Sequence, residues 1–527
     1  MRKKLQLIAT CSVLAISTTG FSQTPARYLN DVFTSVQKTS NVIYGNNLSV
    51  LTGTLTPSDL KMDVYEPTGD TATKRPLVII LHSGAYLPAI ANGSAIGSKT
   101  DSAVVEMCIR FAKKGYVAVA PDYRVGWNPT STNQDVRTGT LLNANYRVMQ
   151  DARNCVRYFR MDKATTNTYK IDTNKIVMGG LGSGAFVALA CGSFQRQKET
   201  DMAKFTNLTL SPPAKYVDSS IMGNVYGTDA RSANTPNYPT YSSKIHMVFN
   251  CGGSIGDSTW IEKGEVPVVG FQCTKDPAAP YKTGAILVSS TGAFVVEGTG
   301  NGDILRILNK ANINNNKKLK DSEFNDVYTT NANKANQGYE GLYPFITPAP
   351  GAAVTCAASP ENQKEQSAPW DWWNEAYLTN AYNSYSSTTN GGIVNCRQKL
   401  GNPDMSAAKA RKYIDTIQGY LAPRMVCALG LPGCVPKSTT IGIAETISSS
   451  TVSVFPNPAT SAINFSINGA NNIQSIALYN VTGTLVKQIS GLNIKNYTIT
   501  RDGLISGFYI AQIQLNTGTV TKKIILE

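Results

Sequence analysis

The sequence predicts an α/β fold, with a mostly parallel β-sheet covered by helices on both faces, followed by a small all-β sandwich at the C-terminus. In residues 27–435, short, wholly apolar segments alternate with amphipathic helical segments. This alternation is typical of buried parallel strands that are joined by helices. From residue 451 onward, short segments of alternating polarity are broken by Gly and Asn, which indicates antiparallel β-structure.

The expected buried strands of the first domain are short apolar runs. They are residues 77–81, 117–120, 176–178, 246–250 and 266–271. Apolar residues at helical spacing predict one helix through Ala103, Met107 and Phe111, and a second helix that begins at about Ala144. The stretch 301–402 is rich in Asn, Ser, Thr and Gly, and we expect it to form long loops with a few helices.

We assign the first domain to residues 27–435, and further segments precede and follow it. Residues 1–22 have the basic start, the apolar run and the small final residues of a secretory signal peptide. Residues 436–450 are rich in Ser and Thr and are expected to form a linker to the sandwich, residues 451–527. No other segment is apolar over a length that predicts a transmembrane helix.

The composition narrows the class of protein. Of the 527 residues, 42% are hydrophobic and 16% are charged, as in an ordinary folded protein. The formal net charge is +14, but the Lys and Arg residues are dispersed, so we expect no nucleic-acid partner. The chain has two histidines, His82 and His246, and no C-x-x-C motif. We therefore expect no metal site, and no motif indicates a cofactor.

Nine cysteines remain after removal of residues 1–22, and export would expose them to oxidising conditions. Because nine is an odd number, at least one thiol stays free or pairs with another molecule. Cys427 and Cys434 flank a Gly/Pro turn, so a local disulfide between them is expected. Cys108 and Cys155 lie on the two expected helices and are a second candidate pair.

The most informative segment is GLGSG at residues 180–184. A nucleophile elbow, G-x-S-x-G, is a tight strand-to-helix turn that needs small flanking residues. The two outer glycines fit these flanks, which places Gly182 at the apex, where a serine is expected. If Ser183 were the apex, one flank would be Leu181, which fits poorly. The segment therefore indicates a hydrolase turn without its nucleophile.

Other motifs indicate the same kind of domain. His82-Ser83-Gly84-Ala85-Tyr86 resembles the H-G-G-A-[FY] loop whose backbone amides form an oxyanion hole, with Ser83 in place of a glycine. Asp122-Tyr123-Arg124 and Gln150-Asp151-Ala152 also match motifs of this kind. Over about residues 55–300 the chain resembles the α/β-hydrolase superfamily, in particular its carboxylesterase and lipase-like branch. The resemblance implies a triad in the chain order Ser, Asp or Glu, and His.

The triad is incomplete at the positions that the resemblance aligns. Gly182 fills the nucleophile slot and has no hydroxyl group. Ser183 is next to it, but we expect Ser183 to cap the following helix. Asp276 fills the acid slot and, without a histidine, is expected to bond backbone amides ahead of Pro277. No histidine follows Asp276, and Tyr343, the candidate for that slot, would be a weak base at neutral pH.

An aromatic segment is a candidate ligand surface. Trp370, Trp372 and Trp373 lie close together in the sequence. One interpretation is an aromatic wall for a sugar ring or an apolar ligand. The alternative is a lid or a late helix that packs on the sheet.

The C-terminal segment carries motifs of its own. Residues 451–527 contain VFPNPA, LYNVTG and, near the chain end, KKII. They resemble the C-terminal sorting domain of proteins exported by the type IX secretion system (T9SS) of Bacteroidetes-type bacteria. The resemblance implies recognition by the secretion translocon, removal of the domain, and release or attachment at the cell surface.

Three hypotheses about function remain open. The first is a non-catalytic binding protein, a pseudo-hydrolase that is secreted or held at the outer-membrane surface and binds an ester, a carbohydrate or a peptide. The second is a carboxylic-ester hydrolase that uses Ser183 with Asp276. The third is a structural or adhesive surface protein. The missing nucleophile and histidine favour the first hypothesis.

Overall fold

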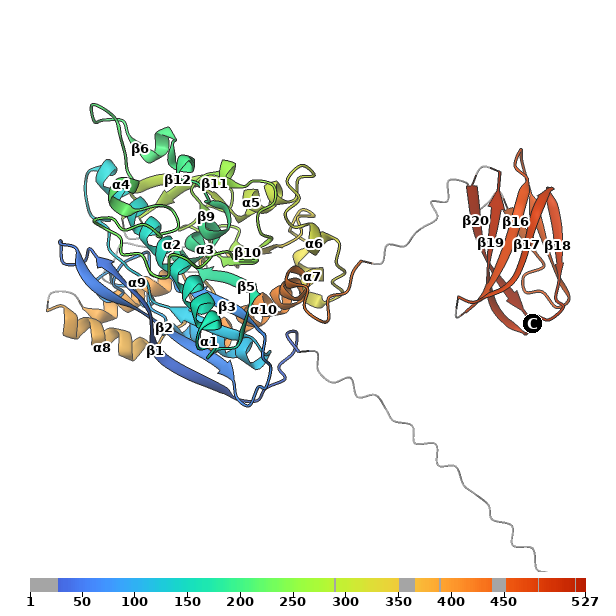
Figure 1. Ribbon diagram of the computed structural model, residues 1–527, viewed down its shortest axis with the longest axis horizontal. Helices are drawn as coiled ribbons and strands as arrows, with labels where there is room; N and C mark the ends of the chain where they lie inside the picture. Colours follow the sequence, from blue (N-terminus) through green and yellow to red (C-terminus); the bar gives the residue numbers. More distant parts are fainter. Residues whose placement is uncertain are drawn as a thin grey trace, which may run out of the picture. The chain divides into compact units, whose positions relative to one another are not determined.

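The chain divides after Pro436 into two compact units (Figure 1). The computed structural model describes residues 27–288, 291–349, 365–387, 390–437, 452–481, 483–516 and 518–527. The segment predicted as a signal peptide, 1–22, and nearly all of the predicted linker, 436–450, lie outside the described residues.

The first unit is built on an eight-stranded sheet whose central strands are parallel. The strands, in their order across the sheet, are β1 (Val36–Ser49), β2 (Thr56–Pro67), β4 (Val117–Pro121), β3 (Arg75–Leu81), β5 (Ile171–Leu181), β8 (Met247–Cys251), β10 (Val268–Cys273) and β13 (Leu342–Phe345). β2 pairs antiparallel with β1 and with β4, and all other neighbours are parallel. The GLGSG segment therefore begins with the last two residues of β5, a central strand, and leads into α3.

Helices cover both faces of this sheet, and each face has its own apolar core. The longer helices of the central fold are α1 (Ser102–Lys113), α2 (Gln134–Ala164), α3 (Ser183–Ser193), α5 (Asn301–Leu308) and α10 (Ala407–Leu429). One core receives side chains from α2, α3 and α5, and the other from α1 and α10. Successive strand residues point to opposite faces, so Ile79 enters the first core and Ile80 the second. The prediction of a mostly parallel sheet between helices is confirmed.

Further elements complete the first unit. They are the helices α4 (Ser219–Met222), α6 (Lys317–Lys320), α7 (Val327–Ala332), α8 (Glu375–Tyr385) and α9 (Gly391–Leu400), the 3-10 helices Gln197–Thr200, Ala203–Phe205 and Ser258–Trp260, and the strands β6 (Thr206–Asn207), β7 (Ala214–Lys215), β9 (Ser254–Ile255), β11 (Thr283–Leu287) and β12 (Phe294–Gly300). α9 contacts the segment after β3, where Gln398 Nε2 donates a hydrogen bond to Gly93 O at 2.9 Å.

Helix α2 is longer than the sequence predicts. It begins at Gln134 rather than near Ala144. Asn133 precedes it as an N-cap, and its side chain accepts hydrogen bonds from the amides of Asp135 and Val136. A side-chain oxygen at this position satisfies amides that the first turn of a helix leaves free. Asn133 was thus the sequence signal for the earlier start of α2.

A buried ion pair joins α2 to the segment after β4. Arg124 N donates to Asp151 Oδ2 at 2.9 Å, and Arg124 Nε donates to Asp151 Oδ1 at 2.9 Å. The two side chains are 1% and 0% exposed. The pair thus links two of the motifs that carry the superfamily resemblance, and it holds α2 beside the strand that precedes GLGSG.

The two expected cysteine pairs have opposite outcomes. Cys427 and Cys434 form the predicted disulfide. The pairing of Cys108 with Cys155 is wrong, because both are free and buried. Cys108 lies on α1 in one core and Cys155 lies on α2 in the other, so the sheet separates the two thiols.

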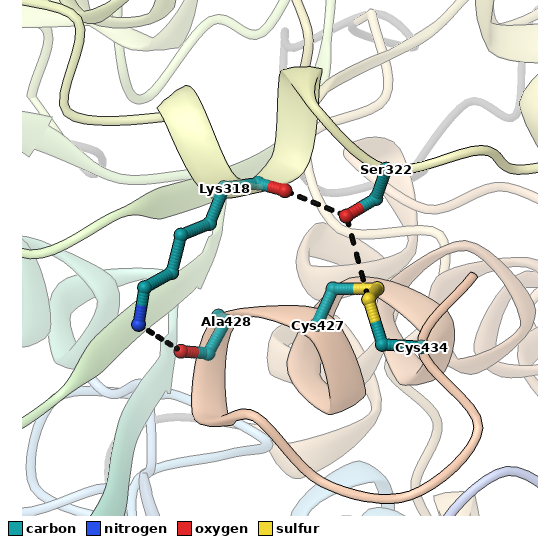
Figure 2. Close-up of a disulfide and its surroundings, with 5 residues drawn as sticks. All are labelled: Lys318, Ser322, Cys427, Ala428 and Cys434. Carbon is teal, nitrogen blue, oxygen red and sulfur yellow. Dashed lines mark hydrogen bonds between the residues drawn. A yellow bond between two sulfur atoms is a disulfide. The ribbon is translucent and has the colours of Figure 1, made fainter. Parts of the chain in front are cut away.

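The disulfide lies where α10 ends beside α6. Figure 2 shows Cys427, on the last turn of α10, joined to Cys434 in the following loop. Ser322 Oγ lies 3.5 Å from Cys434 Sγ and donates to Lys318 O at 2.6 Å. Lys318 Nζ donates to Ala428 O at 3.3 Å (Figure 2). These contacts connect two segments that are far apart in the sequence.

The second unit contains only β-structure within its described residues. One sheet has the order β14 (Val452–Phe455), β15 (Ala462–Ile467), β18 (Asn496–Thr500), and the other has the order β17 (Leu485–Ile494), β16 (Ile473–Asn480), β19 (Gly507–Leu515), β20 (Gly518–Leu526). All neighbouring strands are antiparallel. Apolar side chains of both sheets share one buried core. The predicted all-β sandwich is confirmed.

We expect that replacing both cysteines of the disulfide, Cys427→Ala with Cys434→Ala, lowers the free energy of unfolding by about 2 kcal/mol, because the unfolded chain regains the freedom of a short closed loop. Urea denaturation followed by circular dichroism measures this change. The unaltered protein with its disulfide intact, under the same non-reducing conditions, is the reference. An unchanged unfolding midpoint would show that the bond adds no stability.

We expect Asp151→Asn to lower the free energy of unfolding by about 3 kcal/mol, because it leaves the buried Arg124 guanidinium without a counter-charge. The same denaturation experiment measures the loss. Asp59→Asn, at an exposed position, is the matched control and should change stability by less than about 0.5 kcal/mol. Equal stability of the two variants would contradict the importance of the buried pair.

Candidate active site

The turn after β5 has the backbone of a nucleophile elbow. Gly182 has φ 49° and ψ −119° and occupies the N-cap position of α3. Residues other than glycine adopt positive φ values at a cost. The outer glycines permit close packing: a Cβ at Gly180 would lie 2.2 Å from Gly184 O, and a Cβ at Gly184 would lie 2.4 Å from His82 O. Gly182 therefore lies at the apex of a turn that packs against the loop after β3.

The hydroxyl group of Ser83 occupies the space of a side chain at this apex. A Cβ at Gly182 would lie 2.2 Å from Ser83 Oγ and 3.1 Å from Ser83 Cβ. Both distances are shorter than a favourable non-bonded contact. The sequence shows that Ser83 replaces a glycine of the loop, but it does not show that this serine faces Gly182, because the two residues are far apart in the chain.

Ser183 does not cap α3 as predicted. It is the first residue of the helix, and the cap position belongs to Gly182. Ser183 Oγ instead accepts a hydrogen bond from Ala85 N at 3.0 Å, and Ser183 O accepts one from Tyr86 OH at 2.8 Å. The Ser183 hydroxyl thus joins the start of α3 to the loop after β3.

Aromatic side chains hold this loop in place. Tyr123 OH donates to His82 O at 2.7 Å, and the rings of Tyr123 and His82 stack with centroids 4.1 Å apart. Trp127 Nε1 donates to Ala85 O at 2.7 Å. The loop therefore has a defined backbone position, which an oxyanion hole requires because its amides must be oriented in advance.

The loop retains free backbone donors. Gly84 has a φ of 110°, and a Cβ there would lie 2.5 Å from Gly97 Cα, so only a glycine fits. Within the described residues, the amides of Ser83, Gly84 and Ser183 donate to no acceptor of the protein. These amides could donate to a ligand oxygen placed beside the apex.

The two histidines have other partners. His82 Nδ1 donates to Ser83 O at 2.5 Å, and His82 Nε2 lies 3.6 Å from Asp122 Oδ1. Burial lowers the pKa of His82. His246 precedes β8, at the opposite end of the parallel strands from the elbow, and its Nδ1 accepts from Ile176 N at 3.2 Å. Burial lowers the pKa of His246 to about 4.

Asp276 lies in the turn after β10. Its Oδ1 accepts hydrogen bonds from Ala278 N at 2.8 Å and from Ala279 N at 3.2 Å, as expected of a turn aspartate. Burial raises the pKa of Asp276 to about 7. A Cβ at Gly252 would lie 3.6 Å from Asp276 Oδ2 and 3.7 Å from Trp370 Cζ2. Asp276 Oδ2 and the Trp370 ring thus both lie near Gly252, and both histidines have hydrogen-bond partners other than this carboxyl group.

Tyr343 does not stand in for the histidine. It lies within the buried strand β13 and is 8% exposed. Its ring stacks on that of Phe271 with centroids 6.0 Å apart. Burial raises the pKa of Tyr343 further above its ordinary value, which makes the hydroxyl a still weaker acid. The candidate assignment of Tyr343 is wrong because its strand packs the side chain into a core.

The three tryptophans of the predicted aromatic wall have different neighbours. Trp370 is 1% exposed and belongs to the core between the sheet and α10. Trp372 is partly buried, and the Arg411 guanidinium lies 5.4 Å from its ring centroid. Trp373 Nε1 donates to Asn395 Oδ1, on α9, at 2.8 Å. Trp370 thus packs on the sheet, which was the alternative interpretation of the segment.

Two further acids near the site were not predicted from the sequence. Asp101 Oδ2 accepts from Gly97 N at 2.9 Å, and burial raises the pKa of Asp101 to about 7. Asp371 is 4% exposed, and burial, together with the charge of Asp101, raises its pKa well above the ordinary value. Asp371 Oδ2 and Trp370 Nε1 are buried and have no hydrogen-bond partner among the described residues. The only sequence signal was the position of Asp371 between Trp370 and Trp372.

Over the described ranges, no three His, Cys, Asp or Glu side chains are grouped so that they could hold a metal ion. In the same part of the chain, no helix combines the length and the apolar character that crossing a membrane requires.

A mostly parallel sheet with an elbow after β5, an oxyanion-type loop after β3 and an acid after β10 defines an α/β-hydrolase fold. Residues 62–290 match the BD-FAE family. Residues 453–527 match the secretion system C-terminal sorting domain. The chain therefore carries an esterase-like α/β-hydrolase domain and a T9SS sorting domain. The sorting domain implies interaction with the secretion system and delivery to the cell surface or the extracellular space.

Solved structures of esterase 2 from Thermogutta terrifontis are similar to part of the chain. The form phosphorylated by paraoxon is 18% identical, with a TM-score of 0.28, and the match covers 49% of this chain and 75% of that one. The butyrate-bound form is 16% identical, with a TM-score of 0.29, and covers 49% and 76%. The apo form is 17% identical, with a TM-score of 0.28, and covers 49% and 76%. No curated protein sequence gives a match.

We expect Asp276→Asn to remove a pH-dependent loss of stability. Below about pH 4 this carboxyl is protonated in both the folded and the unfolded chain. Between about pH 4 and its folded-state pKa of about 7, only the unfolded chain releases the proton, so the free energy of unfolding falls as pH rises. Asp276→Asn should therefore gain on the order of 1–2 kcal/mol relative to the unaltered protein between pH 4.5 and pH 7.5.

Urea denaturation at the two pH values measures this difference. The variant keeps an Oδ1 acceptor for the two amides, so the comparison isolates the titration of Asp276 from that of Asp101 and Asp371. Asp59→Asn, at an exposed position, is the control and should follow the unaltered protein at both pH values. A variant that loses stability at pH 7.5 would show that the ionised carboxylate stabilises the fold.

Proposed function

We propose that the first unit is a pseudo-hydrolase, a non-catalytic binding protein that the T9SS delivers to the cell surface or the surrounding medium. The observation that carries this proposal is the apex of the elbow. Gly182 offers no nucleophile there, and Ser83 Oγ takes the space in which the side chain of a nucleophile would begin. An acyl-transfer reaction of this class needs a positioned nucleophile at that point.

The lack of a base supports the proposal independently. An α/β-hydrolase triad uses a histidine that an acid orients and stabilises. Both histidines have hydrogen-bond partners other than Asp276, and the Trp370 indole, which lies near Gly252 as Asp276 does, has an N–H that cannot accept a proton. A carboxyl group with a pKa near 7 is also partly neutral at neutral pH, so it would stabilise a cation weakly.

The backbone amides of the loop and two tryptophans favour binding of a ligand. The amides of Ser83, Gly84 and Ser183 can donate to a carbonyl or carboxylate oxygen of a ligand. Trp372 and Trp373 are partly exposed and can contact a sugar ring or an apolar group. The ligand classes that fit these groups are an ester, a carbohydrate or a peptide.

Export is part of the proposal. We propose that residues 1–22 are a signal peptide and that residues 436–450 link the two units. Residues 451–527 would then engage the translocon while the first unit crosses the outer membrane. The proposed role at the cell surface or in the medium follows from this route.

The alternative of an esterase that uses Ser183 with Asp276 is less favoured. Ser183 Oγ is hydrogen-bonded to Ala85 N, and no histidine follows Asp276, where the chain order of the triad would place one. A purely structural or adhesive role leaves the free amides of the loop unexplained.

We expect the purified full chain to hydrolyse 4-nitrophenyl acetate and 4-nitrophenyl butyrate no faster than its Ser183→Ala variant, with rates equal to within about twofold at pH 6 to 9. The physical reason is that the elbow presents neither a nucleophile nor a base. Absorbance at 400 nm measures release of the phenol. Saturable turnover that Ser183→Ala abolishes would overturn the proposal and favour the esterase.

A further inference from the structure

We propose that the Ser83 side chain excludes a nucleophile from the apex of the elbow. Residue 182 can carry a side chain only when residue 83 has none. The inference goes beyond the proposed function, because it concerns which residue excludes the nucleophile and holds whether or not the protein turns over an ester. It assigns to Ser83 a role that the glycine of the usual loop does not have.

The distances around the apex carry the argument. A Cβ at Gly182 would lie 2.2 Å from Ser83 Oγ, 3.1 Å from Ser83 Cβ and 3.9 Å from Ser83 Cα. The first distance is a severe overlap, the second is a tight contact, and the third is ordinary van der Waals contact. The space beside the apex therefore grows in two steps, first with the loss of the hydroxyl and then with the loss of Cβ.

The backbone around Ser83 is held on both sides, so the loop cannot simply withdraw. His82 Nδ1 donates to Ser83 O at 2.5 Å, and Tyr123 OH donates to the same oxygen at 3.2 Å. On the other side, Gly84 is in close backbone contact with Gly97. Rotation of the Ser83 side chain could move Oγ away, but Cβ would stay 3.1 Å from the apex Cβ.

This geometry describes an exchange of side chains between two facing positions. The usual arrangement has a glycine in the loop and a serine at the apex. In this chain the serine is in the loop and the glycine is at the apex, so one side chain still fills the shared space. A single substitution at residue 182 would place two side chains in that space.

The first test uses a thiol as a probe of the apex. Gly182→Cys is made in three backgrounds, with Ser83 unaltered, with Ser83→Ala and with Ser83→Gly, and the full chain reacts with Ellman's reagent under native conditions. We expect the reaction rate to rise in that order and to differ by at least about tenfold between the first and the last, because an unobstructed thiol at a helix N-terminus is readily deprotonated.

Two controls accompany this test. The described free cysteines are buried, and the unaltered chain gives the background rate. Ser98→Gly combined with Gly182→Cys removes a serine that lies in a neighbouring loop, and it should react like Gly182→Cys alone. Equal rates in all three Ser83 backgrounds would overturn the proposal, since they would show that the Ser83 side chain does not obstruct a side chain at residue 182.

The second test measures stability and covers the case of a poorly folded cysteine variant. Gly182→Ala is made in the same three backgrounds, and each melting temperature is compared with that of its own Gly182 parent. The strain of a positive φ at residue 182 is common to all three, so it cancels in the comparison. We expect the largest fall with Ser83 unaltered, a smaller fall with Ser83→Ala and the smallest with Ser83→Gly.

An equal fall in all three backgrounds, or loss of folding in all three, would contradict the proposal, because Ser83→Gly should accept the added methyl group. Neither test depends on ester hydrolysis. Turnover by the unaltered chain would overturn the proposed function and leave this inference standing, while equal reaction rates and equal melting shifts would overturn this inference alone.

Discussion

The close approach of backbone at the turn after β5 is the constraint on which the site depends. Gly180 and Gly184 lie so near to neighbouring carbonyl oxygens that no side chain fits at either position. This approach brings the start of α3 against the loop after β3, and it sets the backbone of Gly182 at a positive φ. The contact between Gly182 and Ser83 depends on this close backbone packing.

The same packing explains how this architecture accommodates a glycine at the apex. The buried Arg124–Asp151 pair and the ring of Tyr123 hold the loop and α2 in place, and neither contributes a nucleophile. Glycine costs nothing in strain at the apex, because it adopts positive φ readily. A glycine at the apex therefore leaves the supporting contacts intact, and the facing Ser83 hydroxyl fills the space beside it.

Much of the site could be predicted from local sequence, and the misses have a common cause. The flanking glycines predicted Gly182 at the apex, and the turn before Pro277 predicted that Asp276 would bond backbone amides. The contact of Ser83 with the apex and the positions of Trp370 and Asp276 near Gly252 depend on segments that only the folded sheet brings together. The wrong pairing of Cys108 with Cys155 also arose from treating residues on two helices as neighbours without knowing which face each helix covers.

The sequence by itself determined the order of strands and helices, the sorting domain at the C-terminus and the absence of a triad histidine after Asp276. These properties depend on periodicity, on motif spacing and on which residues are present. Tertiary structure alone decided which side chain fills the space beside the apex, that Trp370 packs into a core and which cysteines are separated by the sheet. Such contacts join residues far apart in the chain, and short-range patterns carry no information about them.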